Sequence, residues 1–250
     1  MSLASLFILN RSKLGNNYEN FLTPEGGFPI LNSKGIWTLS KNCKGHSPNQ
    51  ETYLNFLGEK IIEDGPAIAK LPNIESFIKR FNNKWMEARK ENNILHTHNI
   101  EEIRFNSKIP SYKWLSNFFP TLIYSKEPLP GIFSRVESAY KAYKDFLVNK
   151  NEQTVLQIAK MTDVTKVKKL KADVPKTITV PLMRQLIHLK FDQNPILKER
   201  LIATAPLPLI EDTDNIFWGE GSTSAEKGSG ENKLGQILME ERDSIKNVKV

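Results

Sequence analysis

Residues 134–147 read SRVESAYKAYKDFL and predict an amphipathic helix. Ser134 is the expected N-cap, and Glu137 follows at the third helical position, which completes a capping box. The apolar stripe that this helix would turn toward a core consists of Val136, Ala139, Tyr140, Tyr143 and Leu147. These start and periodicity signals make the helix the best-defined element of the chain.

The polar face of the same helix carries Glu137, Lys141 and Lys144, whose spacing of four and three residues places them on one side. Glu137 and Lys144 are two turns apart, roughly 10 Å between their backbones. Two long side chains at that separation can reach one small ligand from either end. In the alternative interpretation, Glu137 and Lys141 form an exposed ion pair that adds a few tenths of a kcal/mol to helix stability.

The sequence around this helix predicts a mainly α fold with a minor α+β part. Apolar periodicity predicts further helices at Val155–Met161, Pro181–Phe191, Pro195–Ala203 and Leu234–Ile245, the second with a proline near its start. Short strands are expected at Glu102–Phe105, Thr121–Tyr124 and Leu207–Ile210. We therefore expect most of the core within residues 101–250.

Residues 1–100 differ in character and predict a mixed α/β extension. Gly, Asn and Pro separate short apolar runs in the first half of this segment, a pattern typical of short strands joined by turns. Helical spacing begins near Tyr53 and returns from Ile74 to Ala88, with Asn73 as the expected cap. The polar segment Lys90–Asn99 reads as a connection. We therefore divide the chain into an extension, 1–100, and a larger domain, 101–250.

The composition excludes collagen-like and disordered chains, because 39% of the 250 residues are hydrophobic and 25% are charged. Lys and Arg total 35 against 28 acidic residues, which gives a net charge of +7 and favours polyanionic partners. Five lysines lie in Lys166–Lys176, with only Asp173 against them. This segment is either a solvated helix face or linker, or a patch that contacts phosphates.

Location is indicated by what the sequence does not contain. No run approaches the roughly 18 apolar residues of a membrane span, and the first residues lack the flanks of a secretory signal. The single cysteine, Cys43, cannot form an internal disulfide, which suits a reducing compartment. We therefore expect a cytoplasmic protein without a membrane partner.

A metal site is not expected. Cys43, His46, His96 and His98 are the possible ligands, but their spacing matches no structural zinc pattern. His188 stands alone on a predicted helix and is interpreted as structural.

A glycine-rich segment near the C-terminus offers a possible ligand loop. Trp218-Gly219-Glu220-Gly221 is followed by Gly228, Gly230, Asn232 and Gly235 as a helix begins. Glycines allow close approach of the backbone, and free N–H groups at a helix start suit phosphate. The segment fits neither the dinucleotide fingerprint nor the P-loop. Trp218 is interpreted either as a core residue or as an aromatic platform for a base.

Seven short motifs, taken together and in this order, resemble the NADAR (YbiA-like) family over residues 101–250. They are Leu115-Ser116-Asn117-Phe118, Val136-Glu137 running to Ala142 and Lys144, Leu189-Lys190-Phe191 with Asn194, Leu209-Ile210-Glu211, Trp218-Gly219-Glu220-Gly221, Gly230-x-Asn232-x-Leu234-Gly235, and Leu238-Met239-x-x-Arg242. Residues 1–100 resemble no known family.

The resemblance implies a mostly helical N-glycosidase that needs no cofactor and no metal. It implies two substrate classes: ADP-ribose on guanine bases of nucleic acid, and ribosylated intermediates of riboflavin biosynthesis. By motif, Glu137 and Lys144 are the expected catalytic residues. The expected substrate-binding residues are Asn117, Trp218, Gly219, Gly230 and Asn232. A carboxylate such as Glu137 suits the positive charge that develops at the sugar C1, and a partly neutral Lys144 suits a Schiff base.

Three departures from the family pattern bear on the substrate. Thr204-Ala205-Pro206 replaces the usual Thr-Gly, a tryptophan is missing near Pro175, and Asn215 stands where an Asp is usual, although Asp214 is adjacent. Three functions therefore stay open: removal of ADP-ribose from nucleic acid, cleavage of a small ribosylated metabolite, and a non-catalytic nucleotide or nucleic-acid binding module.

Overall fold

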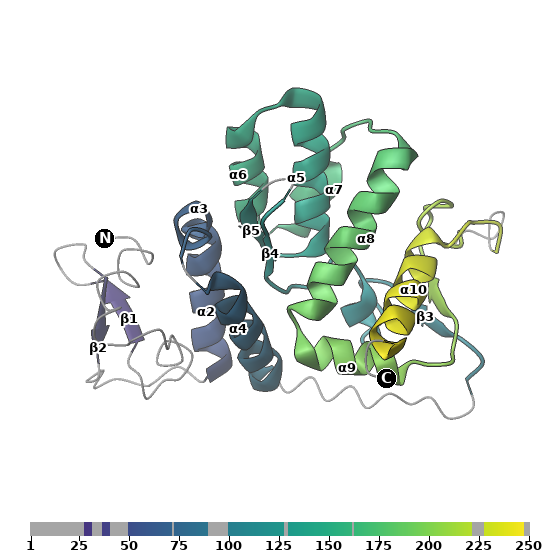
Figure 1. Ribbon diagram of the computed structural model, residues 1–250, viewed down its shortest axis with the longest axis horizontal. Coiled ribbons are helices and arrows are strands. Elements are labelled where there is room, and N and C mark those ends of the chain that lie inside the picture. The colour runs from purple at the N-terminus through teal and green to yellow at the C-terminus, as the bar shows by residue number, and fades with distance from the viewer. Residues whose placement is uncertain are drawn as a thin grey trace.

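The computed structural model describes residues 28–31, 37–40, 50–71, 73–89, 100–127, 130–161, 163–221 and 228–247, and these form a mainly helical protein with short strands, as the sequence predicted (Figure 1). The helices are α2 Gln50–Glu63, α3 Gly65–Ile68, α4 Ile74–Ala88, α5 Val136–Asn149, α6 Glu152–Lys160, α7 Val164–Lys169, α8 Lys176–Asp192, α9 Pro195–Ala203, α10 Lys233–Asn247 and the 3-10 turn η3 Lys113–Leu115. The strands are β1 Phe28–Leu31, β2 Trp37–Ser40, β3 Ile103–Phe105, β4 Ile123–Ser125, β5 Gly131–Phe133 and β6 Leu209–Glu211. Among the described residues, no helix is long and apolar enough to cross a membrane.

The main core lies between α5, α8, α9 and α10. Helix α5 turns its apolar stripe inward as predicted, with Val136, Ala139, Tyr140 and Tyr143 buried, although Leu147 is exposed. Helices α5 and α6 form an antiparallel pair, and α8 crosses beside α5 and α10 (Figure 1). This arrangement brings Tyr140 of α5 against Trp218 in the 216–221 loop that leads toward α10.

The strands pair two by two. β3 and β6 are parallel, with Ile103 opposite Leu209, although a hundred residues separate them in the chain. β4 and β5 form an antiparallel hairpin, with Ile123 opposite Phe133, and β1 and β2 form another hairpin. Such short pairs are stable only against a larger apolar surface. Helices supply that surface for β4–β5 and for β3–β6.

Helices α2, α3 and α4 pack against the β4–β5 hairpin and build a second core with it. Leu122, Tyr124 and Ile132 contribute to this core from the larger domain. The buried amide of Asn82 joins the two parts: its Nδ2 donates to the carbonyls of Leu122 at 2.9 Å and Gln193 at 3.0 Å, and its Oδ1 accepts from the Leu122 N–H at 3.1 Å. The extension thus satisfies backbone groups of the larger domain.

The starts of α5 and α8 differ from the prediction, and α6 begins at Glu152 rather than at Val155. Helix α5 begins at Val136 after Arg135, and Ser134 is not its cap: the Ser134 hydroxyl instead donates to the carbonyl of Met161 at 3.3 Å. Helix α8 begins at Lys176, so Pro181 lies inside it rather than near its start. Proline is common at the first position of a helix, which is why the sequence predicted a start at Pro181. The turn before Pro181 nevertheless is helical, and its Thr179 contacts Tyr140 of α5.

Smaller differences concern the short elements. Helix α9 matches its predicted bounds, β5 was not among the predicted strands, and α7 gives the basic segment a helical start. Asn73 does precede α4, but its side chain makes no cap bond. Cys43, His46, His96 and His98 lie outside the described residues.

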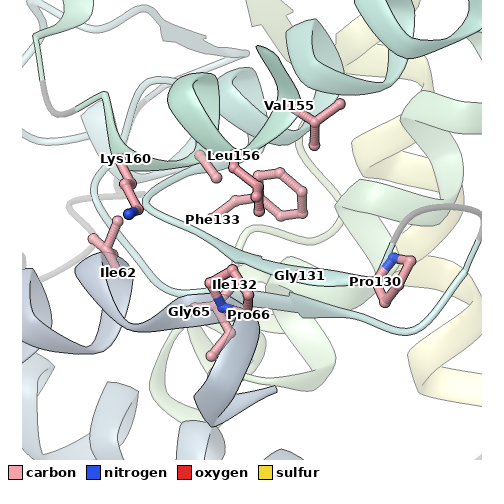
Figure 2. A pocket seen from close by; sticks show the side chains of 11 residues that line it. Ile62, Gly65, Pro66, Pro130, Gly131, Ile132, Phe133, Val155, Leu156 and Lys160 are labelled. Atoms are coloured by element: carbon pink, nitrogen blue, oxygen red, sulfur yellow. The ribbon is translucent and has the colours of Figure 1, made fainter. Parts of the chain in front are cut away.

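A small pocket opens at the seam between the extension and the larger domain (Figure 2). Apolar side chains line it, from the α2–α3 corner, β5 and α6, and Lys160 is the only charged residue among them. None of the predicted site residues lines this pocket. It lacks the convergent polar groups that a catalytic site needs.

Candidate active site

The site begins at the first turn of α5. The backbone N–H of Glu137 donates to the carbonyl of Asn117 at 3.0 Å, so a neighbouring loop satisfies the helix start in place of a capping side chain. The Glu137 side chain is only 13% exposed. Its carboxylate therefore lies at the positive end of a helix and largely out of water.

Three lysines surround this carboxylate. Lys141 lies nearest, with its Nζ 3.8 Å from Glu137 Oε1, and it also donates to the carbonyl of Leu170 at 2.8 Å. Burial raises the pKa of Glu137, while Lys141, Lys168 and Lys144 oppose the rise. The ion pair that the spacing suggested is present, but it is sheltered rather than exposed.

Lys144 lies one turn further along the same face. Burial lowers the pKa of Lys144, and the neighbouring Lys141 lowers it further, while Asp173 and Glu137 oppose this. Its Nζ is 5.5 Å from the centre of the Tyr140 ring. A larger fraction of neutral amine makes Lys144 a better nucleophile than an ordinary surface lysine.

Tyr140 is a site residue that the sequence analysis treated only as core. It lies between Glu137 and Lys144, is 6% exposed, and hydrogen bonds through its side chain to Thr179 and Trp218. The Trp218 ring stands almost perpendicular to it, at 5.9 Å between centroids. The structure therefore brings Trp218 to the α5 face, half-buried, with one side packed on the core.

Asn117 faces the same region from the loop after η3. It is 6% exposed, and its Nδ2 lies 3.4 Å from the sulfur of Met183. Its buried Oδ1 has no hydrogen-bond partner among the residues that the structure describes. Since a buried acceptor without a donor costs about 1–3 kcal/mol, a ligand hydroxyl or amino group suits this position.

The glycine-rich segment is packed against itself more tightly than expected. The N–H groups of Asn232, Lys233 and Leu234 donate to the carbonyls of Gly219, Phe217 and Trp218, so these amides at the start of α10 are not free for phosphate. A side chain at Gly219 or Gly230 would come within 2.6 Å of neighbouring backbone. The two glycines thus permit close loop packing, and their contact with a substrate stays a prediction.

Asn232 and Asn215 shape this segment. Asn232, at a positive φ of 48°, accepts from the Glu211 N–H and donates to the Leu209 carbonyl, both at 2.9 Å, and so occupies the open edge of β6. Asn215 Oδ1 accepts from the N–H groups of Phe217 and Trp218 at 3.0 Å. A carboxylate could accept the same bonds, so this departure from the family pattern preserves the loop.

Glu211 and Lys190 are two buried charged residues that the sequence analysis quoted as motif letters but assigned no role. Burial raises the pKa of Glu211 to about 8, with Glu137 adding to the rise and Lys190 opposing it. Burial lowers the pKa of Lys190 to about 7, opposed by Glu211. In the sequence, each of these charged residues stands inside an apolar run, and that position could have indicated a buried charged group.

Glu211 makes the stability of the protein depend on pH. The pKa of Glu211 rises from 4.5 to about 8 on folding, so between these pH values the folded state keeps a proton that the unfolded chain has lost. The free energy of unfolding therefore falls as the pH rises from about 4.5 to about 8. We expect Glu211→Gln, which cannot ionise, to gain about 1–3 kcal/mol relative to the parent between about pH 5 and pH 8.5. Urea unfolding at both pH values measures this, and a pH-independent difference would contradict it.

A basic and aromatic rim borders the site. Lys166, Lys168, Lys169, Lys171 and Lys176 are all exposed. Lys168 lies over the ring of Phe118 at 4.5 Å, and Lys176 over that of Phe217 at 3.7 Å. By contrast, His188 forms a surface pair with Glu241 at 3.1 Å, in agreement with a structural role. The part of the chain that the structure describes holds no cluster of three or more metal-ligating side chains.

Comparison with known proteins identifies relatives of this chain. N-glycosidase YbiA of Escherichia coli (strain K12) is 38% identical over 71 residues, which cover 28% of this chain and 42% of that protein. Riboflavin biosynthesis protein VVA0006 of Vibrio vulnificus (strain YJ016) is 39% identical over 69 residues, 27% of this chain and 18% of that protein. The chain therefore matches less than half the length of these curated relatives.

Among solved structures, the NMR structure of the E. coli protein YbiA covers 60% of this chain and 92% of its own, with 27% identity and a TM-score of 0.48. The NADAR domain model matches residues 104–246, which include all seven proposed site residues. The match extends over more than half of the chain, so this protein belongs to the NADAR domain family.

Proposed function

We propose that this protein is an N-glycosidase that hydrolyses a ribosyl C1–N bond, and that its substrate is ADP-ribose attached to guanine bases of nucleic acid. The observation that carries the proposal is the sheltered carboxylate of Glu137 among three lysines, one of which, Lys144, has a lowered pKa. The similarity to N-glycosidase YbiA of E. coli supports cleavage of the same class of bond.

The geometry suits a mechanism in which the two residues divide the work. The Glu137 carboxylate stabilises the positive charge that develops at the sugar C1 as the bond to the base weakens. The Lys144 amine forms a bond to C1 as the C1–N bond breaks, and its proton goes to the departing base. Opening of the sugar ring then gives an iminium, which water hydrolyses to the free sugar and the regenerated amine.

The other predicted residues would orient the substrate. The unpartnered Oδ1 of Asn117 suits a ribose hydroxyl or a base amino group. Trp218, half-buried beside Tyr140, offers part of its ring to a base. Gly219, Gly230 and Asn232 hold the Trp218 loop in place, and we retain them as substrate-binding candidates through that loop.

A nucleic-acid substrate is favoured by the charge beside the site. Lys168 and Lys176 each cover a phenylalanine ring at its border, and the exposed lysines of residues 166–176 continue from there. Phosphates next to the modified base would meet these lysines, and salt would weaken the contact. The protein's net charge of +7 acts in the same direction.

The second candidate is an N-glycosidase of a small ribosylated metabolite, such as an intermediate of riboflavin biosynthesis. The similarity to a riboflavin biosynthesis protein of Vibrio vulnificus supports it. A soluble ribosylated nucleotide would then be turned over without dependence on the basic rim. A third outcome, binding without turnover, would indicate a nucleotide or nucleic-acid binding module.

The test is incubation of the purified protein with an oligonucleotide that carries ADP-ribosyl-guanine, followed by mass spectrometry with and without borohydride. We expect release of ADP-ribose and a reduced sugar adduct on the α5 peptide. Lys144→Ala should lose the adduct and on the order of 10³-fold in rate, because its nucleophile is gone. Lys70→Ala, an exposed lysine of the extension outside the rim, is the matched control and should keep the adduct.

Either of two results would count against this assignment. Turnover of a soluble nucleotide with no release from the oligonucleotide would favour the metabolite substrate. Release of ADP-ribose by the Lys144→Ala variant at the parental rate would exclude a Schiff base on Lys144 from the mechanism.

A further inference from the structure

Lys190 places an amino group in the middle of the main core. It lies on the inner face of α8, is fully buried, and ranks among the largest fully buried side chains of the described residues. Moving an ammonium group out of water costs several kcal/mol unless polar partners replace the water. A leucine or methionine would fill the same space at no such cost, so the charge calls for an explanation.

The contacts of Lys190 lead to the candidate site. Its Nζ donates to the carbonyl of Leu115 at 3.1 Å and to that of Ser116 at 3.0 Å. These two residues immediately precede Asn117, whose own carbonyl accepts the Glu137 N–H at 3.0 Å. These hydrogen bonds and the backbone of residues 115–117 therefore connect the Lys190 amino group to Asn117 and Glu137, two of the predicted site residues.

The rest of helix α8 supports the same loop. Thr179 hydrogen bonds with Tyr140, Met183 lies against the Asn117 amide, and Lys190 follows two turns after Met183 on the same face. Beneath them, Glu211 on β6 is within electrostatic range of both Lys190 and Glu137. One face of α8 thus contacts Tyr140 of α5, the Asn117 amide and the carbonyls of Leu115 and Ser116.

We propose that Lys190 is a positioning residue for the active site: by binding the carbonyls of Leu115 and Ser116, its buried ammonium holds Asn117 and the first turn of α5 in their working geometry. This inference rests on the proposed function for its activity test only. Its structural test is independent of any substrate.

The experiment compares Lys190→Met with Leu201→Ala. The first variant keeps the volume and removes the donors. The second creates a cavity in the same core, at a fully buried position on α9 that makes no described hydrogen bond to the 115–117 loop. Leu201→Ala leaves a cavity, and Lys190→Met leaves two buried carbonyls without their donor, so both variants are measured at a temperature where each is folded. The substrate-free readout is the side-chain amide resonance of Asn117, assigned with Asn117→Asp and followed by NMR.

We expect Lys190→Met to shift and broaden the Asn117 amide resonance and to lower kcat/KM about 10–100-fold, because a displacement of about 1 Å at a reacting centre has effects of that size. Leu201→Ala should leave the resonance in place and stay within about twofold of the parental kcat/KM. An unchanged Asn117 resonance in Lys190→Met, or an equal change in Leu201→Ala, would overturn the proposal.

Lys190→Gln, which keeps a shorter donor, takes the place of Lys190→Met if that variant does not fold. Failure of both to fold would also overturn the proposal, since Lys190 would then be required for the fold itself. If the parent turns over no substrate, the proposed function fails, but the NMR comparison still decides the role of Lys190.

Discussion

Replacing Glu137 with glutamine is expected to lower kcat/KM for C1–N cleavage by about 10³-fold while the chain stays folded. The neutral amide keeps the shape of the side chain but cannot stabilise the positive charge that develops at C1. Burial raises the pKa of Glu137, so its charged form costs stability in the folded state. Glu137→Gln should therefore be at least as stable as the parent at pH 8, as is common when a strained catalytic group is removed.

The measurement combines a single-turnover assay with urea unfolding at pH 8. Glu87→Gln is the matched control, because Glu87 is exposed and pairs only with Lys84 and Asn83 in the described structure. It should leave both quantities unchanged. A Glu137→Gln protein that retains more than a tenth of the parental activity would show that the carboxylate is not catalytic.

A chain that begins at Ile100 is expected to lose its stable fold, although it contains the whole segment matched to the family. Removing α2 to α4 would expose Leu122, Tyr124 and Ile132, which are now at most 6% accessible. Each such side chain contributes about 1.5–3 kcal/mol by burial, and three together approach the 5–15 kcal/mol that stabilises a typical domain. The Asn82 bonds to Leu122 and Gln193 would be lost as well.

Thermal unfolding of this fragment and of the full chain measures the effect. The control is a chain that begins at residue 49, because it keeps α2 to α4 and every described residue of the two cores. That control should unfold near the parental temperature. A fragment from Ile100 with a parental melting temperature would instead establish residue 100 as a true domain boundary.

The local sequence pattern was sufficient to predict helices α5 and α9, and α5 carries Glu137 and Lys144. The period of apolar residues located α5 and α9, and the spacing of Glu137, Lys141 and Lys144 placed them on one face. Seven motifs in order indicated the family. These features depend on neighbours within two helical turns, so the sequence contains them directly.

Local rules failed where a distant group replaced a local one. The start of α5 is satisfied by the carbonyl of Asn117 rather than by Ser134, and α8 runs through Pro181 because the turn before it packs against α5. Tyr140 looked like a core residue because its ring is buried, yet its hydroxyl reaches Thr179 and Trp218. In each case the deciding partner is remote in the chain.

By itself, then, the sequence determined the helical class and the family, and it predicted the pair Glu137 and Lys144, since helical periodicity and motif order are properties of the linear chain. Only the tertiary structure decided that Glu137 is sheltered among lysines, that Asn117 has an unpartnered oxygen, and that Lys190 and Glu211 lie beneath them. The physical reason is desolvation: the pKa of a carboxylate or an amine depends on how much water the surrounding elements exclude, and those elements meet only in the folded protein.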